Sequence, residues 1–154
     1  MTAPTEAVAA NSPLNVLYVE DYPPCVALVR HALGRRAPGI RLEAVATVAE
    51  AIERLTRFEG SPHDPPRAAA LQTPRFDAVL TDLNLPDGSG LDILAHVRAR
   101  RLPLAVVVMS SSTEDDIAAG ALRAGADAYL AKRDDYLLRL PQVLYAATAR
   151  PPAE

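Results

Sequence analysis

The chain has 154 residues, of which 49% are hydrophobic and 23% are charged, a composition typical of folded globular domains rather than disordered chains. A net charge of -3 argues against the basic stripe of a nucleic-acid-binding surface, and the sequence has neither a membrane-length apolar run nor a signal-peptide pattern. The single cysteine, Cys25, rules out an internal disulfide and fits a reducing, cytoplasmic setting.

Five strand patterns alternate with five helix patterns along the chain. Short apolar or alternating runs predict strands at 14–19, 40–46, 76–81, 104–109 and 126–131. Helices are predicted at 23–36, 47–58, 91–100, 112–125 and from 141 to about 150. This strict (βα)5 alternation implies a three-layer, doubly wound α/β fold, with a five-stranded parallel sheet between helices on both faces.

Three helix starts carry recognisable sequence signals, either prolines suited to a first turn or a capping box. They are Pro23-Pro24, Thr47 with Glu50, and Ser112 with Asp115. At the end of the chain, a helix that ran through Pro141 would be kinked. We therefore expect a short turn at 134–140 and place Pro141 in the first turn of the last helix.

Three segments lie outside the alternating pattern. Residues 1–13 form a polar tail that is predicted to be disordered, and residues 151–154 form a short second tail. Residues 59–75 contain four prolines and exceed the usual length of a helix-to-strand connection, so they are interpreted as a surface insertion. The remaining residues, 14–150, are expected to form one domain.

Chemically suggestive side chains follow four of the five predicted strands. Glu20 and Asp21 follow the first strand, Asp82 the third, Ser110 the fourth, and Lys132, the only lysine of the chain, the fifth. Right-handed crossovers place the carboxyl ends of parallel strands on one edge of the sheet, where ligands bind in open α/β folds. We therefore expect these groups to converge in one shallow cleft.

The predicted carboxylate cluster needs a cation. Two carboxylates about 4 Å apart repel by roughly 4 kcal/mol at an effective dielectric near 20, and oxygen ligands suit Mg²⁺. Lys132 adds a compact positive charge, and Ser110 adds a hydroxyl donor for phosphoryl oxygens. Together these groups indicate a phosphoryl-transfer site with Asp82 as nucleophile. Each residue taken alone also has an ordinary explanation, such as a helix N-terminal acid or a solvated lysine.

Four motifs resemble the receiver domain of two-component response regulators, which has the fold of the bacterial chemotaxis response regulator. The motifs are VLYVED at 16–21, VLTD at 79–82 with LPDG at 85–88, VVVMS at 106–110, and GADAYLAK at 125–132. They follow one another in the family's order, and the resemblance covers residues 15 to about 149. It implies a phosphoprotein of phosphorelay signal transduction, with the strand order 2-1-3-4-5.

The resemblance also implies roles for the acidic residues. Asp82 would be the phosphoacceptor, which forms an aspartyl phosphate, and would contribute to the metal site. Asp21 would bind Mg²⁺ directly and Glu20 mostly through water, while Asn84 would bind it through the backbone carbonyl.

Three further positions match the family's switch. Lys132 should pair with Asp82 and later with the phosphoryl group. Ser110 occupies the switch Ser/Thr position, and Tyr129 occupies the switch aromatic position. Phosphorylation is expected to draw Ser110 inward and let Tyr129 rotate, which changes a protein-binding surface on the last two helices and the fifth strand.

The expected partners follow from the same resemblance. A sensor histidine kinase or histidine phosphotransfer protein would donate the phosphoryl group, and a downstream protein would read it, with a homodimer as an option and no nucleic acid or membrane. The domain would not be a turnover enzyme, and Asn84 and Ser112 would line the water path for self-dephosphorylation. Nothing after Arg150 resembles an output domain, which is compatible with a stand-alone receiver or with a segment of a hybrid kinase.

The sequence departs from the family where Arg133 follows Lys132 in place of the usual proline, so the route into the last helix is expected to differ. Ser111 replaces a small alanine, and the 59–75 insertion is not a family feature. Three alternatives compete with the receiver interpretation. They are a Mg²⁺-dependent phosphatase, whose Asp-x-Asp pair would lie on the first strand; a nucleotide or flavin module, which would need a glycine-rich first turn; and a degenerate receiver that binds proteins independently of phosphorylation.

Overall fold

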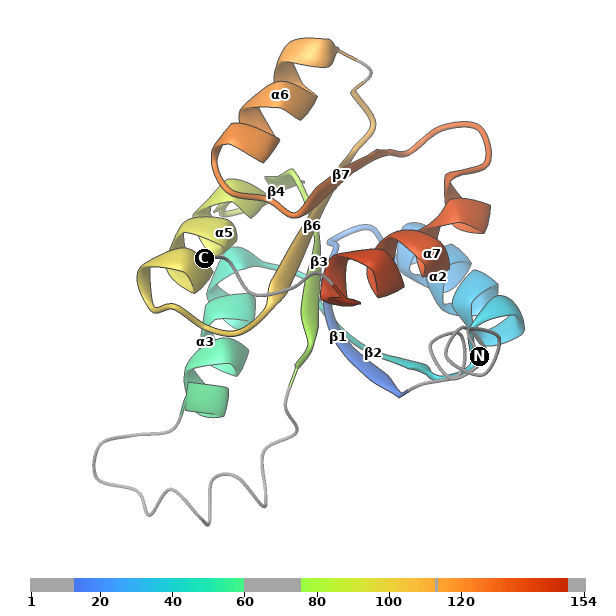
Figure 1. Ribbon diagram of the computed structural model, residues 1–154, viewed down its shortest axis with the longest axis horizontal. Coiled ribbons are helices and arrows are strands. Elements are labelled where there is room, and N and C mark those ends of the chain that lie inside the picture. The colour runs from blue at the N-terminus through green and yellow to red at the C-terminus, as the bar shows by residue number, and fades with distance from the viewer. Residues whose placement is uncertain (1–12, 60–75, 113, 150–154) are drawn as a thin grey trace, which may run out of the picture.

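The computed structural model describes residues 13–59, 76–112 and 114–149 (Figure 1). Its main sheet has five parallel strands in the order β2-β1-β3-β6-β7, which confirms the predicted order once the strands are numbered along the main sheet alone. The strands are β1 (Leu14–Val19), β2 (Ile40–Val45), β3 (Ala78–Asp82), β6 (Ala105–Ser110) and β7 (Ala128–Ala131).

The three central strands are buried on both faces, which explains their unbroken apolar sequences. Along β1, Leu17 and Val19 pack on one side of the sheet, whereas Val16 and Tyr18 pack on the other. Parallel strands covered by helices on both faces read as continuous hydrophobic runs rather than as alternating ones. The edge strand β2 is partly exposed along most of its length, in keeping with its alternating sequence.

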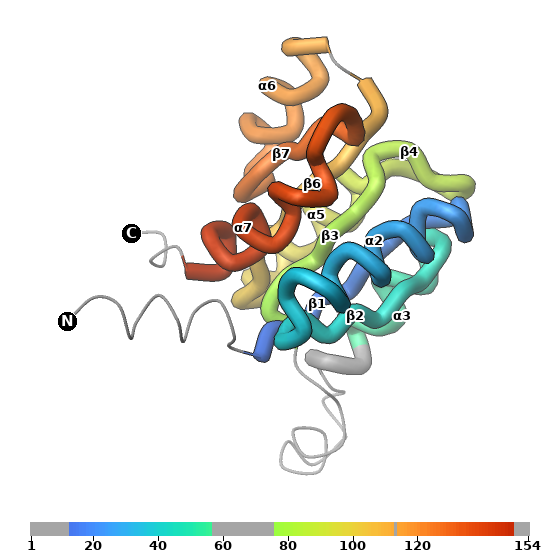
Figure 2. Tube along the Cα trace, turned by 90° about the vertical axis from the view of Figure 1, so that its right-hand side faces the viewer, coloured from blue at the N-terminus to red at the C-terminus, as the bar shows by residue number. Residues whose placement is uncertain are grey.

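In the described part of the chain, five helices cover the sheet in two groups. They are α2 (Pro23–Arg36), α3 (Val48–Glu59), α5 (Gly90–Ala99), α6 (Asp115–Arg123) and α7 (Tyr136–Ala149). Helices α2 and α7 lie side by side over one face, and α3, α5 and α6 cover the other (Figures 1 and 2). The core is therefore split by the sheet into two apolar layers, and burying each large apolar side chain contributes about 1.5–3 kcal/mol.

The start of α7 differs from the prediction, because the helix begins at Tyr136 and runs through Pro141. A proline there removes the N–H that would bond to the carbonyl four residues earlier, at a cost of about 3 kcal/mol. The burial of apolar side chains before and after the proline offsets this cost, because Leu140 and Leu144 are both fully buried against the sheet. Tertiary packing thus outweighs the local preference that placed the helix start at Pro141.

The start of α6 also corrects the sequence analysis. The N-cap residue is Glu114, with no side-chain cap hydrogen bond, so Ser112 and Asp115 do not form a capping box. The Ser112 hydroxyl instead accepts a hydrogen bond from the amide of Glu114 at 3.2 Å, within the loop before the helix. At α3 the predicted signal works largely as expected, because the Thr47 hydroxyl accepts from the amide of Glu50 at 3.0 Å.

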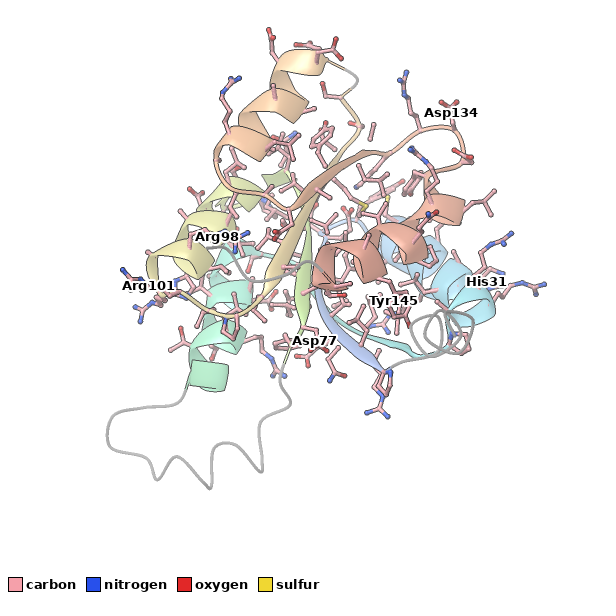
Figure 3. The ribbon with its side chains drawn as sticks, in the orientation of Figure 1. His31, Asp77, Arg98, Arg101, Asp134 and Tyr145 are labelled. Atoms are coloured by element: carbon pink, nitrogen blue, oxygen red, sulfur yellow. The ribbon has the colours of Figure 1, made fainter. Side chains whose placement is uncertain are left out.

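The loop from β7 into α7 turns at Asp134, whose φ of 55° lies in the left-handed region. Aspartate is one of the few residues other than glycine that adopts this conformation readily. Figure 3 shows Asp134 at the outer end of this loop. The backbone thus turns toward α7 one residue after Arg133, the residue at which the sequence departs from the family pattern.

Arg98 of α5 (Figure 3) links this helix to the chain near the amino ends of β6 and β7. Its guanidinium donates hydrogen bonds to the carbonyl of Gly125 at 2.7 and 3.2 Å and to the carboxylate of Asp127 at 2.8 Å. The Asp127 carboxylate also accepts a bond from the amide of Val106 on β6. Gly125 itself has φ of 113°, which explains a glycine at the position that follows Ala124, the C-cap residue of α6. These contacts fix where β7 enters the sheet.

The predicted tails at 1–13 and 151–154 and the predicted insertion at 59–75 lie almost entirely outside the described residues. Of these three segments, the structure describes only Pro13 and Glu59. Among the described residues, no helix is both long and apolar enough to cross a membrane.

Candidate functional site

The site is built around Asp82, the last residue of β3. Its side chain is 16% exposed, so it is accessible yet held on the central strand of the sheet. Gly90, at the start of α5, packs against the Asp82 carbonyl so closely that a Cβ atom there would lie 2.5 Å from the oxygen. Only glycine permits this approach of the two backbone segments. The next helix therefore begins directly beside Asp82.

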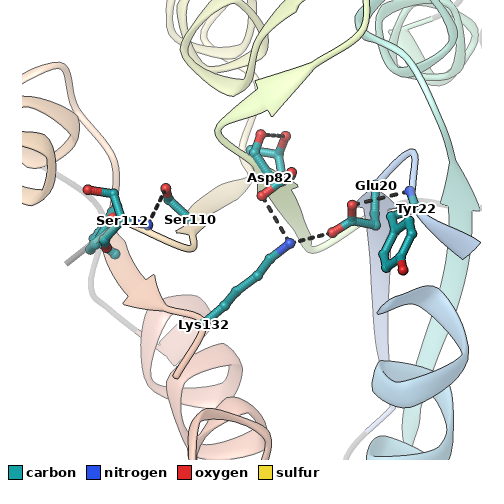
Figure 4. Close-up of polar contacts among 8 residues, drawn as sticks. Glu20, Tyr22, Asp82, Ser110, Ser112 and Lys132 are labelled. Carbon is teal, nitrogen blue, oxygen red and sulfur yellow. Dashed lines mark hydrogen bonds and ion pairs between the residues drawn. The ribbon is translucent and has the colours of Figure 1, made fainter. Parts of the chain in front are cut away.

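Two more carboxylates come from the neighbouring strand β1. Glu20 and Asp21 follow its last residue, and oxygens of Glu20, Asp21 and Asp82 all lie within 4.8 Å of one another. Glu20 is only 4% exposed, whereas Asp21 is open to solvent. The amide of Tyr22 donates to the Glu20 carboxylate at 3.3 Å (Figure 4). The structure thus brings together the three acids that the strand-end pattern selected.

Lys132 enters the same cluster from the end of β7. Its ammonium lies 2.5 Å from the Glu20 carboxylate and 3.0 Å from that of Asp82, bridging the two (Figure 4). The backbone of Lys132 is held as well, because its amide donates to the carbonyl of Ser110 at 2.8 Å. The Lys132 side chain is 12% exposed, so solvent screens these ion pairs only weakly.

The charges and the burial of the cluster shift its ionisation. Burial raises the pKa of Asp82, and the hydrogen bond and charge of Lys132 lower it only in part, while Glu20 and Asp21 add to the rise. Burial alone would lower the pKa of Lys132, but the hydrogen bonds to Glu20 and Asp82, with their charges, outweigh burial and raise it. The resulting site holds more negative than positive charge around a single ammonium.

The donor set fits a hard divalent cation. Two oxygens on one Mg²⁺, each at about 2.1 Å, lie at most about 4.2 Å apart. A spread of up to 4.8 Å among the three carboxylates therefore suits a mixture of direct and water-mediated ligands. Lys132 pairs with both Glu20 and Asp82, but Glu20 is almost fully buried, so Asp21, which is open to solvent, and the partly exposed Asp82 are the more accessible direct ligands. Asn84 lies two residues beyond Asp82, in the short strand β4 (Asn84–Leu85).

Ser110 and Tyr129 both form a hydrogen bond with the backbone of Ser112. Ser110 is the last residue of β6 and is 2% exposed, and its hydroxyl accepts a hydrogen bond from the amide of Ser112 at 3.1 Å (Figure 4). The hydroxyl of Tyr129, a half-buried residue of β7, donates to the carbonyl of the same Ser112 at 3.1 Å. Both predicted switch residues thus hold the backbone of one residue, Ser112, in the loop before α6, Ser110 through its amide and Tyr129 through its carbonyl.

The sequence analysis missed a second, smaller sheet beside the site. Strand β4 pairs antiparallel with β5 (Gly88–Ser89), and the two join β3 to α5. Asp87, at the tip of this pair, accepts hydrogen bonds from the amides of Val48 and Ala49 at 2.8 and 3.0 Å. The LPDG motif marked a turn, but no local signal indicated that its aspartate would reach a helix 38 residues earlier in the chain.

The comparisons with known proteins agree with this geometry. The family model of the response regulator receiver domain matches residues 16–139. The chain is 34% identical over 131 residues to the response regulator protein PilR of Pseudomonas aeruginosa, covering 85% of this chain and 25% of PilR. It is 42% identical over 86 residues to the transcriptional regulatory protein KdpE of Mycobacterium tuberculosis, covering 54% of this chain and 37% of KdpE.

Solved structures show the same fold. The receiver domain of the response regulator NarL from Mycobacterium tuberculosis has a TM-score of 0.67 and 26% identity, covering 90% of this chain and 99% of that one. The chemotaxis response regulator CheY4 of Vibrio cholerae has a TM-score of 0.63 and 24% identity, covering 86% and 100%. The chain spans only about a quarter to a third of PilR and KdpE, and nearly all of these two structures. The chain therefore belongs to the family of response regulator receiver domains.

Proposed function

We propose that this receiver domain accepts a phosphoryl group on Asp82 from a histidine kinase or a histidine phosphotransfer protein, and that the acyl phosphate switches a protein-binding surface. One observation carries the proposal. Asp82 presents a partly exposed carboxylate 3.0 Å from the Lys132 ammonium, within 4.8 Å of two further carboxylates on the next strand. This arrangement combines a nucleophile, a fixed cation and a cluster of hard oxygen ligands.

The transfer step uses Asp82 as the attacking group. One of its carboxylate oxygens bonds to phosphorus while the phosphorus–nitrogen bond of the donor's phosphohistidine breaks, and the electron pair of that bond stays on the imidazole. Asp21, Asp82 and the Asn84 backbone carbonyl would hold Mg²⁺ directly, and Glu20 mostly through water; the bound ion would supply positive charge to the transferring group. Lys132 already sits beside Asp82 and can follow the phosphoryl oxygens as they gain charge.

The switch is proposed to run through Ser110. Its hydroxyl accepts a bond from the Ser112 amide, which leaves the hydroxyl proton available for a phosphoryl oxygen on Asp82. A movement of Ser110 toward Asp82 would release the amide of Ser112, a residue whose carbonyl Tyr129 also holds. Because Ser112 precedes α6, the change would reach the surface formed by α6, β7 and α7, where a downstream protein or a second copy would bind.

The signalling role has consequences for the class of protein. The domain takes up and loses one phosphoryl group and is not a turnover enzyme, with Asn84 and Ser112 lining the water path for self-dephosphorylation. We place it in the cytoplasm, with neither nucleic acid nor membrane as a partner of the receiver domain itself. Two relatives, the cell cycle transcriptional regulator CtrA of Caulobacter vibrioides and KdpE, are transcriptional regulators by name, and the match covers 31% and 37% of their lengths.

The direct test is chemical phosphorylation followed by intact mass measurement. With Mg²⁺ and acetyl phosphate, the wild-type chain should gain one phosphate, Asp82→Asn should gain none, and chelation of Mg²⁺ should suppress the reaction. Asp134→Asn is the matched control, because Asp134 is an exposed aspartate in the β7–α7 loop and should leave the uptake unchanged. Phosphate uptake by Asp82→Asn at the wild-type level would disprove the proposal.

A further inference from the structure

Asp87 joins two parts of the molecule that are distant in sequence. Its carboxylate oxygens accept hydrogen bonds from the amides of Val48 and Ala49, the first two residues of α3, at 2.8 and 3.0 Å. Amides at this position have no partner within their own helix. The two bonds lower the pKa of Asp87, so the side chain carries the negative charge that a helix N-terminus favours.

The first turn of α3 has local acceptors as well. The Thr47 hydroxyl accepts from the amide of Glu50 at 3.0 Å, and the Glu50 carboxylate accepts from the amide of Ala46 at 2.8 Å. These contacts cap the helix from its own segment, as a capping sequence should. The bonds from Asp87 add something that local capping does not supply, namely a fixed position for the tip of the β4–β5 pair.

The other end of this segment is anchored at the phosphoacceptor. The amide of Leu83 donates to the carbonyl of Met109 at 2.8 Å, and the amide of Gly90 donates to the carbonyl of Leu83 at 2.8 Å. Gly90 also packs directly on the Asp82 carbonyl. The segment between Asp82 and α5 is therefore held at its base by β6 and at its tip by α3, with Asn84 in between.

We propose that Asp87 is a positioning residue for the metal site: by anchoring the tip of the β4–β5 pair to the first turn of α3, it fixes the backbone of Asn84, through which Mg²⁺ is bound. This inference rests on the proposed function, in which the Asn84 carbonyl is a metal ligand. Because binding linkage is reciprocal, occupation of the metal site must in turn tighten the contact between Asp87 and α3.

The first experiment compares two variants that both weaken the start of α3. Asp87→Asn replaces one acceptor oxygen by an amide donor and detaches the β4–β5 tip, whereas Thr47→Ala removes the local cap and leaves the Asp87 contacts in place. Mg²⁺ titration by calorimetry should show an increase in Kd of about tenfold for Asp87→Asn, at the lower end of effects seen when supporting residues of a metal site are lost. For Thr47→Ala the Kd should stay within about twofold of wild type, although both variants lower Tm.

The second experiment needs no variant and therefore does not depend on how Asp87→Asn folds. In the wild-type chain, Mg²⁺ should shift the amide resonances of Val48 and Ala49 and slow their hydrogen exchange, while the amide of Glu50, which is bonded to Thr47, should change much less. Equal Kd values for wild type and Asp87→Asn, or unmoved Val48 and Ala49 amides at saturating Mg²⁺, would overturn the inference. A wild-type chain that binds no Mg²⁺ would instead overturn the proposed function.

Discussion

The two loops that flank the site are held in different ways. The loop from β3 to α5 is fixed at its base by Leu83 and Gly90 and at its tip by Asp87, with a two-stranded ladder between them. In the described part of the loop from β6 to α6, which leaves out residue 113, Ser110 and Tyr129 hold the backbone of Ser112 to the sheet. The first loop thus suits the proposed role of a scaffold for the nucleophile and metal, whereas the second suits the proposed switch through the Ser110 hydroxyl.

Lys132 contacts the strand end that precedes each loop. Its ammonium pairs with the carboxylate of Asp82, and its amide donates to the carbonyl of Ser110. Lys132→Met should lower the free energy of unfolding by about 2–4 kcal/mol at pH 7, since it leaves buried Glu20 without its cation. The pKa of Lys132 is raised in the folded state, so its stabilising effect is present below the ordinary value of 10.5 and is lost as pH rises through the higher folded value.

Urea denaturation at pH 7 and at increasing pH above 10.5 measures both effects. Arg133→Met is the matched control, because Arg133 is 60% exposed and makes only a surface ion pair at 3.8 Å with Asp134. It should change the free energy of unfolding by no more than about 0.5 kcal/mol. Equal losses in the two variants would show that the ion pairs of Lys132 contribute nothing beyond those of a surface residue.

Gly90 tests the rigidity of the first loop. A Cβ atom at Gly90 would lie 2.5 Å from the carbonyl oxygen of Asp82 and 2.9 Å from Cγ2 of Thr81, and a backbone oxygen cannot move away as a long side chain can. Gly90→Ala should therefore cost about 1–3 kcal/mol in denaturant unfolding. At Gly34 in α2, an added Cβ would meet no atom of the described residues within 4 Å beyond its own helix backbone and chain neighbours, so Gly34→Ala should instead stabilise by about 0.5–1 kcal/mol. If Gly90→Ala left the free energy of unfolding unchanged, the backbone at the base of this loop could shift to accommodate the added methyl group.

Tyr129 tests the weaker attachment of the second loop. Tyr129→Phe removes the hydroxyl that donates to the Ser112 carbonyl and should lower the free energy of unfolding by about 0.5–1.5 kcal/mol. Tyr22→Phe serves as the control, because Tyr22 is 59% exposed. The amide spectrum of the Tyr129 variant should change at Ser112 and along α6 while the Asn84–Ser89 segment stays as in wild type. Changes of equal size in both loops would contradict the division between scaffold and switch.

Much of this arrangement could be predicted from the sequence because it depends on short-range patterns. Apolar runs located the five strands to within two residues, and polar residues after three of these runs indicated that Glu20, Asp82 and Lys132 would meet. What could not be predicted depends on contacts between distant segments. The reach of Asp87 to α3 and the packing that carries α7 through Pro141 are decided by the tertiary structure, and neither leaves a signal in a local window.

The distribution of the site along the chain has a consequence for its assembly. Glu20 and Lys132 are separated by 112 positions, and the cluster takes one or more residues from β1, β3 and β7. Loops that join such distant residues close late and at an entropic cost. During synthesis the three carboxylates emerge well before the one ammonium that balances them. Until β7 joins the sheet, the three acids have no ammonium to balance them, and the proposed ability to accept phosphate would arise only when this last strand docks.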